Sequence, residues 1–144
     1  MMNSSTINLS EGLEQFNLVF TDCGEAVTIE FNPHDSDMLM RIEKSQENIE
    51  NALKDLSAED SGKTDALLRA GNLIRGEIDY IFGNKISDKV FQYCGPLTLN
   101  AAGVTFVERF LAAVTPHIRS RIHDANRASA DRIAKHTAKY TNKK

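Results

Sequence analysis

The spacing of apolar residues changes once along this chain, at Pro33. Before Pro33, the runs at residues 16–20 and 26–31 are rich in β-branched and aromatic residues, and the second run alternates apolar with polar residues. Such alternation is typical of a strand with one buried face. After Pro33, apolar residues recur at intervals of three and four, which is typical of amphipathic helices. The sequence therefore predicts a β-hairpin followed by helices.

The segment between the two runs is short enough for a hairpin turn, and it contains Gly24, which tolerates positive φ. Pro33 lacks an N–H and cannot continue a strand, while Asp35 or Ser36 can cap a following helix. An isolated hairpin is only marginally stable in water. We therefore expect the hairpin to pack on the helices that follow it.

Three main helical segments follow, at about residues 36–56, 64–82 and from Asn100 onward. Residues 86–93 can form one or two further helical turns, and Gly83 is placed to end the second helix. Glycine inside a helix is unfavourable, so we attribute Gly71, in the apolar stripe of the second helix with Leu67, to close helix packing.

The third helix contains Pro116, which either kinks it or begins a new helix with Thr115 as N-cap. The predicted fold class is α+β and mainly helical, with the N-terminal hairpin packed on three to four helices and a basic C-terminal helix or tail. We divide the chain into a flexible lead (1–14), one globular domain (15–118) and a basic helical extension (119–144). The expected core residues are Ile42, Ile49, Ile74, Ile78, Phe106 and Phe110.

The net charge of −3 hides a strong asymmetry between the two ends of the chain. Residues 1–118 carry 9 Lys and Arg against 18 Asp and Glu, a net charge of −9. Residues 119–144 carry 8 Lys and Arg against 2 Asp, a net charge of +6. A charge asymmetry of this kind indicates what the protein binds and says nothing of its fold.

The basic segment has a narrow apolar face, with a stripe of Arg and Lys beside it, so a partner can complete its burial. A solvated basic tail is the alternative. We predict an anionic or helical protein as the partner, and nucleic acid second, because the segment has few aromatic residues to stack bases. The candidate contact residues are Ile118, Ile122 and Ile133, with Arg121, Arg132 and Lys135 at the rim.

The sequence offers no catalytic motif. The histidines do not pair at helical spacing, and Gly62-Lys63-Thr64 lacks the upstream glycine of a phosphate-binding loop. Cys23 and Cys94 are 71 positions apart, so we expect free thiols in a reducing compartment. The aromatic residues between 82 and 110 lie among mixed charges and are expected in the core. We therefore predict a protein that is not an enzyme, with no catalytic residue, cofactor or metal.

The polar N-terminus has no signal-peptide pattern, and no apolar run approaches the length of a membrane span. We therefore expect a cytoplasmic protein that does not engage the membrane. Homo-oligomer formation remains open.

The order of parts resembles a known family. A hairpin leads into residues 29–35, a helix begins at Ser36, a second helix ends in residues 78–83, and residues 89–91 precede a last apolar helix at 106–111. This arrangement, over about residues 15–118, resembles the small tail assembly chaperone-like proteins of siphophages and prophages of Gram-positive bacteria.

The resemblance implies a non-catalytic protein that binds the tape-measure protein and keeps it soluble during tail assembly in the bacterial host cytoplasm. The basic segment after residue 118 departs from that compact pattern. Two alternatives remain: a nucleic-acid-binding or packaging accessory protein that uses the basic C-terminal arm, and a structural virion component.

Overall fold

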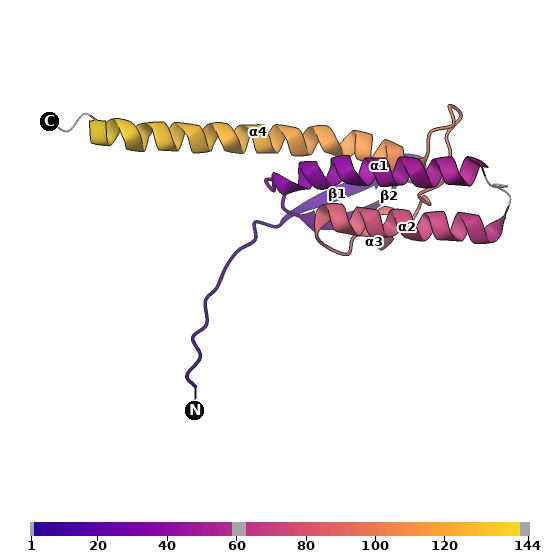
Figure 1. Cartoon of the computed structure of the whole chain (residues 1–144), viewed down its shortest axis with the longest axis horizontal. Coiled ribbons are helices and arrows are strands. Elements are labelled where there is room, and N and C mark those ends of the chain that lie inside the picture. The colour runs from indigo at the N-terminus through magenta and orange to yellow at the C-terminus, as the bar shows by residue number, and fades with distance from the viewer. Residues whose placement is uncertain (1, 59–62, 142–144) are drawn as a thin grey trace.

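The computed structural model describes residues 2–58 and 63–141, and its elements follow the predicted order (Figure 1). The strands β1 (Glu14–Phe20) and β2 (Glu25–Phe31) precede the helices α1 (Asp37–Ala58), α2 (Thr64–Phe82), α3 (Ser87–Val90) and α4 (Phe106–Thr141). The predicted α+β, mainly helical fold is confirmed. Within the described residues, no helix combines the length and apolar character needed to cross a membrane.

The strands form an antiparallel hairpin with one apolar and one polar face. Its inner face buries Val27, Ile29 and Phe31 against the helices. On the outer face, the Gln15 side chain donates a hydrogen bond to Glu30 (3.1 Å), and Thr28 donates one to Asn17 (2.9 Å). The outer face is thus held by polar cross-strand pairs and is exposed to solvent.

The helices α1 and α2 pack side by side, and their facing isoleucines form much of the core. A polar link joins them as well, because the buried Ser45 hydroxyl donates to Glu77 Oε2 at 2.6 Å. The expected core is confirmed: Phe106 is partly buried, and the other five residues are buried.

Aromatic rings join the hairpin to the helices. The Phe82 ring centroid lies 4.9 Å from that of Phe31 and 5.9 Å from that of Phe110. The Phe106 ring lies 6.0 Å from the rings of both Phe20 and Phe91. The phenylalanine rings therefore belong to the core, as the sequence predicted, whereas Tyr93, which was also expected there, is 42% exposed.

The start of the last helix was predicted too early, since α4 begins at Phe106 and not at Asn100. The Asn100 side-chain oxygen accepts hydrogen bonds from the backbone N–H groups of Ala102 and Val104, both at 3.0 Å. This local turn competes with a helix. The hydroxyl of Thr105 instead accepts the N–H of Glu108 (3.4 Å) and caps α4.

Pro116 lies inside α4, which runs unbroken past it, so no new helix begins at Thr115. A proline in a helix interior costs about 3 kcal/mol, whereas burying an isoleucine side chain contributes about 1.5–3 kcal/mol. Ile118 and Ile122, beyond Pro116, both lie in the core. Their burial outweighs the cost of the proline, and the predicted domain boundary at residue 118 falls within a continuous helix.

Candidate functional site

The structure divides the six predicted contact residues into two groups. Ile118 and Ile122 are 1% and 6% exposed and belong to the core of this chain, so the structure does not present them to a partner. Ile133 is 56% exposed, and Arg132 and Lys135 beside it are also exposed. Amphipathicity identified an apolar face correctly, but the first part of that face is covered by the chain itself.

Arg121 also acts within the chain. Its Nη1 atom lies 3.0 Å from Glu14 Oε1, and its guanidinium lies 5.9 Å from the centroid of the Phe16 ring. His34 Nδ1 approaches the other Glu14 oxygen at 3.5 Å. Arg121 therefore connects α4 to the start of the hairpin, in an exposed ion pair of the kind that contributes at most about 1 kcal/mol.

Beyond Ile122, the last buried residue of α4, the helix leaves the body of the molecule (Figure 1). We call residues 123–141 the α4 extension. At 1.5 Å per residue, its 19 residues span about 28 Å. Because it is continuous with the docked part of α4, it points away from the acidic body instead of folding back onto it.

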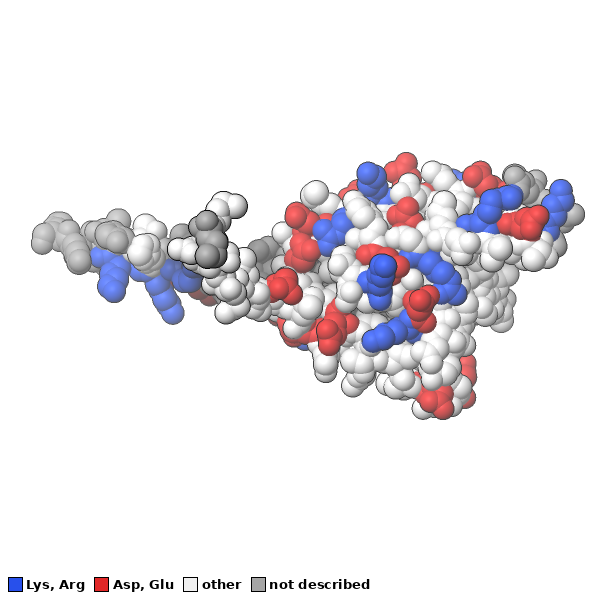
Figure 2. Space-filling model, turned by 90° about the horizontal axis from the view of Figure 1, so that it is seen from below, with Lys and Arg blue, Asp and Glu red and all other residues white. Residues whose placement is uncertain are grey.

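The α4 extension carries four basic residues and two acidic ones, Asp124 and Asp131. Figure 2 shows blue side chains on this projecting part. The four basic residues are Arg127, Arg132, Lys135 and Lys139. Among the described residues, none of these four side chains makes an ion pair.

Of the predicted lead (1–14), residues 2–13 have no regular secondary structure and are exposed, whereas Glu14 already belongs to β1 and pairs with Arg121. Asn32 donates a hydrogen bond to the Glu11 carbonyl (2.9 Å) and fixes the end of the lead at the hairpin. Ile7 and Leu9 contact no core cluster of this chain.

A second candidate surface lies on the first half of α2, where the predicted buried face was wrong, although Ile74 and Ile78 further along the same stripe are buried as predicted. Leu68 is 63% exposed and Leu67 is 37% exposed. Nothing lies within 4 Å of the position that a Cβ of Gly71 would occupy. The expected close helix packing at Gly71 is therefore absent. These residues line a shallow hollow of about 420 Å³, which we call the leucine groove. Its residues are Leu67, Leu68, Gly71, Asn72 and Arg75 of α2, and Gly95, Pro96, Leu97 and Thr98 of the loop before α4.

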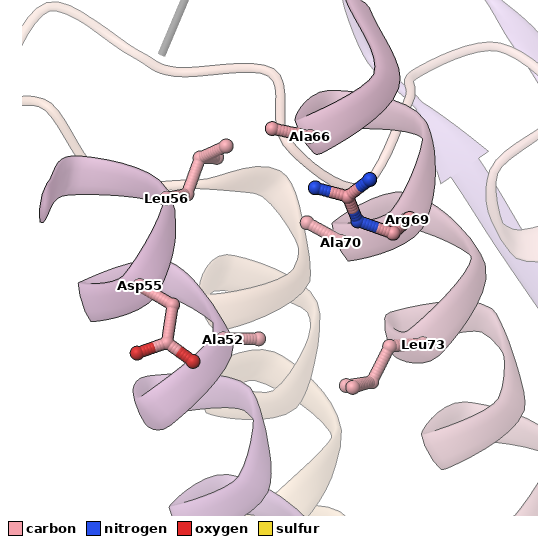
Figure 3. Close-up of a pocket in the computed structure, with 7 residues that line it drawn as sticks. All are labelled: Ala52, Asp55, Leu56, Ala66, Arg69, Ala70 and Leu73. Atoms are coloured by element: carbon pink, nitrogen blue, oxygen red, sulfur yellow. The ribbon is translucent and has the colours of Figure 1, made fainter. Parts of the chain in front are cut away.

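The leucines are exposed because alanines face α1 instead. Ala66 and Ala70 are buried, and they continue with Ile74 and Ile78 in steps of four along one face of α2. Small side chains there leave a hollow of about 280 Å³ between the two helices, with Leu73 at its edge (Figure 3). Giving alanine the same weight as leucine in the periodicity would have found this phase.

A model of a protein family matches residues 25–144, which is most of the chain. It is described as a family of unknown function, DUF6673. The chain belongs to this family. Comparisons with curated proteins and with solved structures gave no match.

Both candidate surfaces of this DUF6673 chain, the leucine groove and the α4 extension, lie inside the matched residues. Among the described residues, no three His, Cys, Asp or Glu side chains come together in a way that could hold a metal ion. Cys23 and Cys94 are free thiols. What these two surfaces offer chemically is an apolar groove and a basic helix.

Proposed function

We propose that this DUF6673 protein is a non-catalytic chaperone of phage tail assembly that binds a helix of the tape-measure protein in the bacterial host cytoplasm. The observation that carries the proposal is the leucine groove. It presents exposed leucines on a helix whose other face is firmly packed, as helix-in-groove recognition requires.

Gly71 supports a docking role for the groove. A glycine in a helix interior costs about 1 kcal/mol against alanine, and in the described part of the chain nothing lies close enough to the Cβ position of Gly71 to require a glycine there. The absence of a side chain leaves the groove floor open to another backbone or to a large apolar side chain.

The rim of the groove indicates the chemistry of the partner. Arg75 lines the groove, lies 3.6 Å from the fully exposed Asp88 and is itself half-buried. A carboxylate on the partner can pair with the exposed side of this guanidinium. The occupant we propose is therefore an amphipathic helix with apolar residues at intervals of three and four and an acidic residue beside them.

The tape-measure assignment comes from the order of elements. The hairpin, α1, a helix α2 that ends at Phe82-Gly83, the short α3 and the apolar start of α4 follow the order seen in tail assembly chaperone-like proteins. A tape-measure protein is long and helical, and its apolar faces need cover before the tail tube forms around it. The leucine groove would cover such an apolar face, and the charged surface of the rest of the protein would keep the complex soluble.

The test is co-expression with a phage tape-measure protein, measuring how much of that protein is soluble and co-purifies. Leu68→Asp places a charge in the groove at an exposed position, and we expect co-purification to fall at least about tenfold. Met40→Asp, at an equally exposed apolar residue of α1 outside the groove, is the matched control and should bind normally. Equal recovery with Leu68→Asp and wild type would contradict the proposal.

The basic α4 extension favours a second candidate, a nucleic-acid-binding accessory protein. Four unpaired cations on a projecting helix can neutralise phosphates and release counterions. This function requires sub-micromolar binding of duplex DNA at 150 mM salt, which weakens when Arg127, Arg132, Lys135 and Lys139 are replaced by Gln. Binding that is absent at 150 mM salt would exclude it.

A further inference from the structure

The α4 extension has one strongly basic side, which continues the side that already contacts the hairpin. At 100° per residue, Arg132, Lys135 and Lys139 fall within a sector of about 60° that also contains Arg121. Arg127 lies on the other side of the helix. Arg121 uses this side to pair with Glu14 at the start of β1. Asp131 precedes Lys135 by one helical turn, but among the described residues none of the three outer cations forms an ion pair with an acidic side chain.

The hairpin end of the molecule has the opposite charge. Residues 2–40 contain seven Asp and Glu and no Lys or Arg, and Arg41, which follows directly, pairs with Asp35 at 2.7 Å, so residues 2–41 have a formal net charge of −6. Of these acidic residues, Asp22, Glu25 and Glu30 are exposed on the turn and on β2. Within the described residues, Arg121 is the one Lys or Arg that pairs with an acidic residue of the hairpin.

The two charged regions cannot neutralise each other within one chain. The α4 extension projects beyond the body as a continuous helix, so its cations move away from the hairpin with every turn (Figure 1). Its length of about 28 Å is close to the roughly 23 Å of a seven-residue strand. The basic side can therefore lie along a hairpin in another molecule.

We propose that the basic side of the α4 extension of one copy binds the acidic hairpin of a second copy, head to tail. The contact repeats between molecules the pairing that Arg121 and Glu14 make within one. Each copy offers both surfaces, so a reciprocal pair of contacts closes into a two-fold dimer, and a contact that is not reciprocated propagates into a ring or a filament. The leucine groove lies outside this contact and remains open.

The first test measures the mass of the full chain by sedimentation at 50 mM and 500 mM salt. We expect higher oligomers at 50 mM salt that dissociate at 500 mM, because exposed charge pairs are screened by salt. Arg132→Glu with Lys135→Glu on the extension, or Glu25→Lys with Glu30→Lys on the hairpin, should each weaken association about tenfold or more. Lys44→Glu with Lys54→Glu, the same change of charge on the exposed side of α1, is the matched control and should associate as wild type does.

The decisive step is to mix the extension variant with the hairpin variant. The reversed extension of one then faces the reversed hairpin of the other, while the two unchanged surfaces still match, so mixing should restore oligomers. Three results would overturn the proposal. The wild type could be a monomer at both salt concentrations, the charge reversals could leave the oligomer unchanged, or the mixture of the two variants could stay monomeric. Duplex DNA binding by a chain that stays monomeric would assign the basic side to nucleic acid instead. None of these results depends on tape-measure binding, which is measured separately.

Discussion

The two halves of α4 belong to one helix but are held by different forces. From Phe106 to Ile122, apolar side chains pack into the core, and the helix tolerates Pro116. From residue 123 onward, most of the described side chains are exposed and none is buried, and the helix depends on its own hydrogen bonds and on its alanine-rich sequence. The helix is therefore stabilised by tertiary burial in the first half and by local sequence preference in the second.

The largest expected difference between the halves comes from their isoleucines. Ile118→Ala should lower the free energy of unfolding by about 2–5 kcal/mol, because it leaves a cavity in the core. Ile133→Ala, in the extension, should change it by less than about 0.5 kcal/mol. Urea denaturation of both variants measures the contrast, and similar losses would show that the extension is docked.

Pro116 tests whether burial really overrides a helix breaker. Pro116→Ala restores a backbone N–H in the helix interior, so it should raise the free energy of unfolding by about 1–3 kcal/mol. Thermal and urea unfolding measure this gain. A loss of stability would mean that the proline is needed where it stands, for example to fix the direction of the second half.

A smaller effect separates the halves by backbone propensity alone. Ala112 and Ala134 are both exposed, one in each half. Ala112→Gly should lower the free energy of global unfolding by about 1 kcal/mol, because the docked half unfolds with the domain. Ala134→Gly should leave global unfolding unchanged and reduce only the amide-exchange protection of the extension. Equal effects on global unfolding would mean that α4 unfolds as one unit.

Much of the fold could be predicted because local signals agreed with burial. The alternation around Val27 and Ile29 gave the hairpin, and Gly83 ends α2 in the left-handed conformation, as expected. The start of α4 was missed because the side chain of Asn100 forms its own turn, although Thr105 followed three residues later by Glu108 is a capping signal.

The candidate site was harder to predict because periodicity shows which face is apolar but not what covers it. Ile118 and Ile133 both lie on α4 and were both predicted to contact a partner, yet only the second is exposed. For Leu67 the error was the opposite one, because the burial of Ala66 and Ala70 on another face of α2 turns Leu67 toward solvent. Both errors concern contacts between elements far apart in sequence, which local spacing does not encode.

The free half of α4 is mechanically a cantilever, clamped at Ile122 and unsupported beyond it. Over its length of about 28 Å, a change in direction of about 10° at the clamp moves the tip by about 5 Å. Small adjustments at one end of the rod thus become large displacements at the other. Copies joined through such arms would share a contact chemistry without sharing one fixed curvature, so the arm would let one chain build assemblies of more than one diameter.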